Sequence, residues 1–473
     1  MNAPEMIENR TFDEIKVGDT ASLSRTLGER EIQLFALASG DVNPAHVDPA
    51  YAATDMFHRV IAHGLWGGGL ISAVLGTELP GPGAIYLSQS LRFERPVGLG
   101  DTVTASVTVT GKSAEHHIVT FDCRCTNQRG EEVIAGEAKV KAPTEKVRRP
   151  RAMLPDIRLS NHDSYRRLME QTAHGTPVPT AIVHPCDPAA ITAAADAAAE
   201  GLIEPILIGP EAKIRTAAEQ AELDISAFRL VPVPHSHAAA QRAVEMTCAG
   251  DAHLLMKGSL HTDELMGAVV AHGSGLRTER RISHVYLLDV PGHPRPLLIT
   301  DAAINIAPTL EEKADIIRNA IDLAHVIGIE QPKVAILSAV ETVNPVMPST
   351  LDAAALCKMA DRGQISGGLL DGPLAFDNAI SEAAAKEKGI VSPVAGKADI
   401  LVVPNLEAGN MLAKQLTFLG GADAAGIVLG ARVPIILTSR ADSLRTRLAS
   451  CAVAVLLARA DTKAAPGVPI TPA

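Results

Sequence analysis

An aspartate and a histidine five residues apart, Asp41 and His46, are the pair in this chain best suited to acid–base chemistry. They lie in the run 39–46 (SGDVNPAH), which follows a segment with amphipathic helical spacing. Gly40 permits backbone angles that other residues avoid and Pro44 fixes its own φ, so we expect a tight, stiff loop. A stiff loop that directs a carboxylate and an imidazole into one cavity suits general acid–base catalysis. The alternative is an Asx turn, in which Asp41 and Asn43 bond their own backbone and His46 is structural.

The residues after this loop predict one apolar helix and an antiparallel sheet. The helix is expected over residues 65–75, which are rich in glycine. Apolar residues alternate with threonine and serine over 102–110, as in a half-buried strand. The strands are expected at 85–93, 102–110, 117–126 and 133–141. A helix wrapped by a curled antiparallel sheet is the hot-dog layout, an α+β fold.

Residues from about 13 to 142 resemble the R-specific enoyl-CoA hydratases of the MaoC-like family. The run 35–46 (FALASGDVNPAH) carries the family's hydratase motif. The resemblance implies that Asp41 and His46 activate water and move the proton of the α-carbon. It also implies that the backbone N–H of Gly64 polarises the thioester carbonyl, with Ser72 near that site. Helix packing for Gly64 and a hydroxyl bonded to its own helix for Ser72 are the structural alternatives.

Length and composition limit the class of protein. A chain of 473 residues predicts two or three domains, and 47% hydrophobic with 3% aromatic residues is typical of α/β layers. A formal net charge of −11 argues against nucleic-acid and anionic-membrane partners. We find neither a signal-peptide pattern nor an apolar run long enough for a membrane helix, and the six cysteines show no metal-ligand spacing. We therefore expect a cytoplasmic protein with no metal site.

The composition and the hydrophobic pattern of the sequence change after residue 142. The segment 143–159 is charged and carries prolines, so it is predicted as a linker between an N-terminal domain (1–142) and a C-terminal domain (160–473). In the second domain, short β-branched runs alternate with alanine-rich helical stretches. This pattern predicts a doubly wound, mostly parallel sheet buried on both faces, with ligands at the carboxyl ends of strands.

Four loops of the C-terminal domain carry glycine, hydroxyl and charged residues directly after apolar runs. They are expected at 254–262, 371–377, 403–410 and 437–443. These loops resemble the phosphate acetyltransferase and phosphate butyryltransferase family, over about 163–458. The motifs that carry the resemblance are DGP at 371–373 and TSR at 438–440, followed by Asp442 and Ser443.

This second resemblance implies an active site in a cleft between two lobes, about 160–299 with 431–473, and about 300–430. Ser439 and Arg440 would hold the phosphoryl group. Asp442 is the nearest carboxylate to deprotonate the CoA thiol, but acetyl-type enzymes place theirs several residues further on, so the base stays open. The further substrate-binding candidates are Lys257, Gly258, Ser259, Thr262, Asn405, Gly409 and Lys414. The structural alternative is that Ser439 caps the last helix and Arg440 pairs with a surface carboxylate.

The two resemblances together predict a bifunctional enzyme of CoA thioesters. The N-terminal domain would reversibly hydrate trans-2-enoyl-CoA to (R)-3-hydroxyacyl-CoA, and the C-terminal domain would exchange CoA and phosphate on a short acyl group. We expect no bound cofactor, with CoA thioesters and phosphate as substrates, and a homo-oligomer. The alternative is a single-activity enzyme in which one domain, preferentially the C-terminal one, senses CoA or acyl phosphate or serves oligomerisation.

Overall fold

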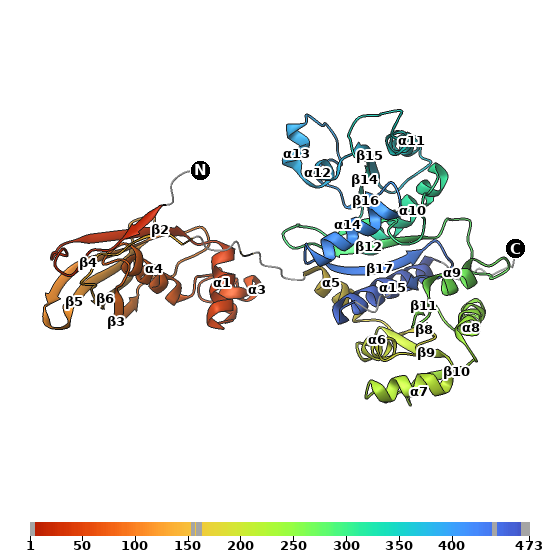
Figure 1. Ribbon diagram of the computed structural model, residues 1–473, viewed down its shortest axis with the longest axis horizontal. Helices are drawn as coiled ribbons and strands as arrows, with labels where there is room; N and C mark the ends of the chain where they lie inside the picture. The colour runs from red at the N-terminus through yellow and green to blue at the C-terminus, as the bar shows by residue number, and fades with distance from the viewer. Residues whose placement is uncertain (1–4, 153–156, 158–162, 438–441, 465–473) are drawn as a thin grey trace. The chain divides into compact units, whose positions relative to one another are not determined.

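The computed structural model describes residues 5–152, 157, 163–437 and 442–464 (Figure 1). The chain forms two compact units, Met1–Ile157 and Arg158–Ala473.

The N-terminal unit has the predicted hot-dog arrangement. A glycine-rich helix, α4 (Gly64–Thr77), packs against a five-stranded antiparallel sheet. The strand order is β2 (Thr20–Thr26), β4 (Thr102–Ser113), β5 (Ile118–Thr126), β6 (Glu132–Lys141) and β3 (Ile85–Phe93). The alternation predicted for 102–110 is confirmed, because the apolar residues of β4 are buried in the core against α4 while the residues between them are partly exposed.

Three short helices lead from β2 to α4: α1 (Glu29–Ser39), α2 (Pro44–Val47) and α3 (Pro49–Ala52). Helix α1 ends at Gly40, whose φ of 76° lies in the left-handed region that glycine adopts without strain. Helix α2 begins at Pro44, and the side chain of Asn43 caps it by accepting a hydrogen bond from the backbone of Ala45. The run 39–46 is thus a short connection fixed at both ends by helix termini.

Part of the predicted linker is ordered against the N-terminal unit. Strand β7 (Arg148–Pro150) pairs with β1 (Met6–Glu8), and the backbone N–H of Val147 donates to the side chain of Asn9 at 2.9 Å. Composition alone suggested a structureless segment here, because a three-residue edge pairing leaves no hydrophobic period in the sequence.

The C-terminal unit contains one continuous sheet of eleven strands. Seven of its ten pairings are parallel, and the three antiparallel ones lie together where β18, β17, β12 and β13 adjoin. The strand order is β10 (Arg229–Pro232), β9 (Ile203–Gly209), β8 (Val178–Val183), β11 (Leu254–Lys257), β18 (Ile435–Ile436), β17 (Asp423–Leu429), β12 (Ser283–Asp289), β13 (Leu297–Thr300), β16 (Ile400–Val402), β14 (Lys333–Leu337) and β15 (Leu369–Leu374). The two outer sets of parallel strands therefore run in opposite directions.

Burial on both faces explains the apolar runs of these strands. In β8, Ile182 packs into one core cluster while Ala181 and Val183 pack into another. Helices cover both faces, and α15 (Leu444–Ala464) runs along β17 (Figure 1). The other helices are η1 (Glu115–His117), α5 (Asp163–Thr172), α6 (Pro188–Ala199), α7 (Glu211–Gln220), α8 (Ser236–Ala249), α9 (Thr262–Val270), α10 (Leu310–Val326), α11 (Pro348–Asp361), α12 (Phe376–Ile380), α13 (Glu382–Glu387) and α14 (Leu406–Phe418).

Two features of this unit differ from the sequence expectations. Residues 371–373, expected in a loop, lie within the edge strand β15, where a proline is tolerated because one side of the strand is unpaired. The sheet also continues without a break from β10 to β15, so the division into two lobes stays a prediction. Within the described residues, none of the helices combines the length and the apolar character needed to span a membrane.

Candidate active sites

In the N-terminal unit, the structure brings Asp41 and His46 together and adds a second histidine, His63. One ligand atom of each of the three lies within 4.8 Å of the others. His63 is the N-cap residue of α4 and is 2% exposed, whereas His46 is half-buried and Asp41 is exposed. The two imidazole rings are in contact, with their centroids 4.0 Å apart and their planes tilted by 37°.

The hydrogen bonds of His46 leave one ring nitrogen available as a base. Nδ1 lies 2.9 Å from the carbonyl oxygen of Ile61. Because a carbonyl oxygen only accepts, this bond places the proton on Nδ1 of the neutral ring. Nε2 then carries the lone pair, which is the atom that a general base needs.

The backbone of Asp41 is held on both sides. Its N–H donates to the hydroxyl of Ser39 at 3.2 Å, and its carbonyl oxygen accepts from Nε2 of His63 at 2.9 Å. The Asx-turn bonds considered for this run are present as well, since one carboxylate oxygen of Asp41 accepts from the backbone of Asn43 at 3.2 Å. That turn holds the carboxylate without removing it from the neighbourhood of His46.

Helix α4 starts beside this pair with an open N-terminus. No side chain caps it, and in the part of the chain that the structure describes the N–H of Gly64 has no acceptor. A cavity of about 310 Å³ adjoins it, lined by His46, His63 and Gly64 together with apolar side chains that include Trp66. A free N–H at a helix start is a donor for developing negative charge on an oxygen.

Ser72, the fourth residue predicted for this site, does not join it. It is exposed on α4, more than two turns after Gly64, and it is not among the residues that line the cavity. Sequence reasoning in turn missed His63, which is adjacent to Gly64 and whose role depends on a ring contact and burial that spacing does not reveal.

The same three side chains form the group that could hold a metal ion in this unit. Two imidazoles and a carboxylate within 4.8 Å are a ligand set for a divalent transition metal. Each imidazole already uses one nitrogen on a backbone carbonyl, as histidine ligands of metals commonly do. The sequence predicted no metal site because His63 lies seventeen residues beyond His46, outside any ligand spacing that we recognised.

In the C-terminal unit, the two residues expected to hold phosphate, Ser439 and Arg440, lie outside the described residues. Asp442 is described and half-buried. Burial, and then the negative charge of Asp442, raise the pKa of Tyr286 on β12. Asp442 therefore lies close to the central antiparallel strands, directly before the start of α15.

Residues 257–259 hold the end of β11 against the end of β8. The backbone N–H of Gly258 donates to the carbonyl of Val183 at 2.9 Å, and a Cβ at position 258 would lie 2.4 Å from that oxygen. The hydroxyl of Ser259 donates to the carbonyl of His184 at 2.7 Å. The ammonium of Lys257 donates to the carbonyl of Leu260 at 3.2 Å. These residues are positioned by contacts to backbone carbonyls, and Thr262 begins α9.

Residues 405–414 belong to the start and the body of α14. The side chain of Asn405 caps this helix by accepting from the backbone of Ala408 at 2.9 Å, and Lys414 is exposed on it. A Cβ at Gly409 would lie 2.6 Å from the carbonyl oxygen of Asp301, so the glycine permits close packing on the loop after β13. Strands β11 and β16 run in opposite directions, so the loops after their carboxyl ends lie at opposite ends of the sheet's strands.

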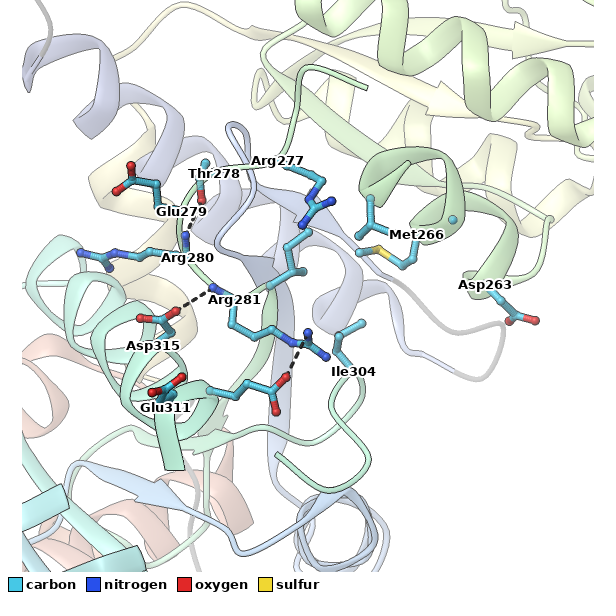
Figure 2. Close-up of a pocket in the computed structure, with 14 residues that line it drawn as sticks. Asp263, Met266, Arg277, Thr278, Glu279, Arg280, Arg281, Ile304, Glu311 and Asp315 are labelled. Atoms are coloured by element: carbon cyan, nitrogen blue, oxygen red, sulfur yellow. Dashed lines mark hydrogen bonds and ion pairs between the residues drawn. The ribbon is translucent and has the colours of Figure 1, made fainter. Parts of the chain in front are cut away.

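A cavity of about 720 Å³ lies alongside α9, between the loop 277–282 and the start of α10 (Figure 2). Most charges of that loop are paired. The guanidinium of Arg281 donates to Asn305 at 2.7 Å and pairs with Glu312 at 3.0 Å. Arg280 pairs with Asp322.

Arg277 differs from its neighbours in this loop. Among the described residues, its guanidinium has neither an ion pair nor a hydrogen bond. It faces an apolar wall that includes Met266 and Ile304, and the cavity also holds carboxylates such as Asp263 (Figure 2). The lining is thus mixed in charge. The run RTERR at 277–281 was the sequence signal for this cavity, and we had not singled it out.

Comparison with known proteins assigns both units to families. The family model described as "Phosphate acetyl/butaryl transferase" matches residues 235–455, and the model described as "MaoC like domain" matches residues 13–127. The chain is 65% identical over 294 residues to a phosphate acetyltransferase of Rhizobium meliloti, covering 62% of this chain and 93% of the relative. It is 45% identical over 272 residues to a phosphate butyryltransferase of Clostridium acetobutylicum, covering 58% of this chain and 90% of the relative.

Solved structures give similar matches. A branched-chain phosphotransacylase from Enterococcus faecalis is 31% identical with a TM-score of 0.53, covering 59% of this chain and 99% of that one. An R-hydratase, PhaJ1 from Pseudomonas aeruginosa, is 46% identical with a TM-score of 0.32, covering 33% of this chain and 100% of that one. The two family models confirm the predicted combination of a MaoC-like domain with a phosphate acyltransferase domain. The identity to the Rhizobium meliloti enzyme over 93% of its length shows that the chain belongs to the phosphate acetyl/butyryltransferase family.

Proposed function

We propose that the C-terminal unit transfers a short acyl group between CoA and phosphate. The observation that carries the proposal is the 65% identity to a phosphate acetyltransferase over 93% of its length. Relatives named as acetyl- and as butyryltransferases both match. We therefore propose an acyl group in the range from acetyl to butyryl.

In this reaction the CoA thiolate attacks the carbonyl carbon of the acyl phosphate. The new C–S bond forms as the bond between that carbon and the phosphate oxygen breaks, and inorganic phosphate leaves. Ser439 and Arg440 are our candidates to hold the phosphoryl group, where Arg440 would stabilise its charge. Asp442 is the candidate to accept the thiol proton. Most of the rate enhancement would come from holding both substrates in one complex.

The test is phosphate-dependent release of CoA from acetyl-, propionyl- and butyryl-CoA. The full-length protein is compared with Arg440→Ala and with Arg215→Ala, whose guanidinium pairs with Glu211 on the exposed side of α7. We expect release by the protein and by Arg215→Ala, with a loss of about 10²-fold or more in Arg440→Ala. Absence of release from all three thioesters would instead support a sensing role for this unit.

We also propose that the N-terminal unit hydrates trans-2-enoyl-CoA to the (R)-3-hydroxyacyl-CoA, in either direction. Three groups support it: the free Nε2 of His46, the carboxylate of Asp41 beside it, and the open N–H of Gly64. Water would lose a proton to this pair as its oxygen adds to the β-carbon. This addition gives an enolate, whose oxygen would accept a hydrogen bond from the N–H of Gly64. The α-carbon then takes a proton to give the product.

This second activity is tested by loss of enoyl thioester absorbance on addition of the protein, with chiral analysis of the product. We expect formation of the R isomer by the protein and its near-complete loss in Asp41→Asn. Formation of 3-hydroxyacyl-CoA at equal rates by Asp41→Asn and the unmodified protein would reject this site.

A further inference from the structure

We propose that His63 is a positioning residue for hydration, which fixes Asp41 relative to His46 and ties both to the start of α4. This inference rests on the hydration proposed above. His63 belongs to none of the residues predicted from the sequence, and its ring touches both members of the pair.

Three hydrogen bonds join the segment 61–64 to the loop 41–46. The backbone N–H of Ile61 donates to the carbonyl of Ala45 at 3.4 Å, and the carbonyl of Ile61 accepts from Nδ1 of His46 at 2.9 Å. The third contact is the bond from Nε2 of His63 to the carbonyl of Asp41 at 2.9 Å. The first two contacts use backbone groups of Ile61, whereas the third depends on the side chain at position 63.

The side chain of His63 is buried and donates from Nε2. The side chain is 2% exposed and lies between the ring of His46, at 4.0 Å, and that of Phe35, at 4.9 Å. Its bond to a carbonyl oxygen places the proton on Nε2. Nδ1 is buried and has no hydrogen-bond partner among the described residues.

The unpartnered Nδ1 indicates that packing alone does not explain this histidine. A buried nitrogen without a partner is unfavourable, and an apolar side chain would fill the same space without that cost. What the imidazole adds is the single bond to Asp41. Gly64, the proposed donor to the enolate oxygen, is the next residue in the chain. The acid–base pair and that donor are therefore held by one short segment.

Loss of the hydrogen bond from His63 to Asp41 should lower the rate of the chemical step. The loop would keep its cap at Asn43, but the main chain of Asp41 would lose its fixed distance from His46. A displacement of about 1 Å between reacting groups costs about 10²-fold in rate. Binding of the CoA portion does not involve this bond, so KM should change little.

The experiment compares His63→Phe, which keeps a ring and removes the donor, with His63→Gln, which keeps a donor near the position of Nε2. His237→Phe serves as the control, because that side chain is 76% exposed on α8. For hydration we expect kcat to fall by about 10²-fold in His63→Phe, with KM within a few-fold, and to be largely restored in His63→Gln. Acyl transfer and thermal unfolding, measured on the same samples, report on folding. If His63→Phe does not fold, His63→Leu replaces it.

A double-mutant cycle with Asp41→Asn separates positioning from general stability. If His63 acts through Asp41, adding His63→Phe to Asp41→Asn causes no further loss of the residual rate. Independent losses that multiply would overturn the inference, as would a His63→Phe variant as fast as the unmodified protein. An unmodified protein that hydrates no enoyl thioester would overturn the proposed function itself, and this inference with it.

Discussion

The candidate sites of the two units differ in how far apart their parts lie along the chain. In the N-terminal unit, the acid–base pair, the second histidine and the helix start all lie within residues 41–64. In the C-terminal unit, the candidate residues extend from Lys257 at the end of β11 to Asp442 before α15, at or after the ends of strands far apart in the sequence. The first site is arranged by local turns and helix caps, whereas the second depends on the order of strands in a sheet.

This difference predicts that each site can be disabled without the other. His46→Gln should lower hydration by about 10³-fold or more and leave acyl transfer unchanged, because it removes the base. Arg440→Ala should do the reverse. The measurement is both rates on the same preparation of each variant. Loss of both activities in either variant, with thermal unfolding unchanged, would show that the sites are not independent.

Two glycines should separate the stabilities of the units. A Cβ at Gly136 of β6 would lie 1.9 Å from the carbonyl oxygen of Ser90, and one at Gly258 would lie 2.4 Å from that of Val183. Each change to alanine forces backbone to move, at a cost of about 1–3 kcal/mol. We expect Gly136→Ala to lower the temperature at which hydration is lost, and Gly258→Ala the temperature at which acyl transfer is lost.

Gly76→Ala on α4 is the control, because a Cβ there meets nothing within 4 Å. Calorimetry of the three variants completes the test. A Gly136→Ala variant that lowers both inactivation temperatures equally would indicate that the two units unfold together.

The smallest expected effect is a pH dependence confined to the C-terminal unit. Burial lowers the pKa of His284 on β12 from 6.5 to about 4. As pH falls through 6.5, this histidine takes up a proton in the unfolded chain but not in the folded one. The unfolded state then binds more protons, so stability should fall as pH drops from 6.5 to about 4 and be unaffected by this group at higher pH.

Urea unfolding of the unmodified protein and of His284→Gln, each at about pH 7 and about pH 5, measures this contribution. We expect the variant to lose less stability than the unmodified protein between the two conditions. An identical loss in both would show that His284 does not titrate differently on folding.

The sequence predicted most of the N-terminal unit because its information is local. The alternation in β4 and the loop between two helix ends are visible in neighbouring residues. Position 63 was missed because its ring contacts His46 and Asp41 across the loop, which residue spacing does not reveal. Ser72 is exposed on α4 and does not line the cavity, so its place near the site stays a prediction.

In the C-terminal unit, the mostly parallel sheet was predictable, whereas the order of its strands was not. Apolar runs such as β8 and β16 indicated buried parallel strands. The antiparallel pairing of β12 and β17 leaves no periodicity in the sequence. It therefore could not be predicted that the loops after β11 and β16 lie at opposite ends of the sheet's strands. The homo-oligomer stays a prediction.

The position of α15 has a consequence for the order of folding during synthesis. Residues 451–455 of this helix are nearly completely buried in the main core of the C-terminal unit, and Arg459 bonds to the carbonyl of Thr172 across 287 residues. That core cannot close until α15 has left the ribosome, while the elements of the hot-dog unit have emerged long before. Nascent chains should therefore complete the hot-dog unit first, while the apolar strands of the second unit stay exposed until α15 is available to cover them.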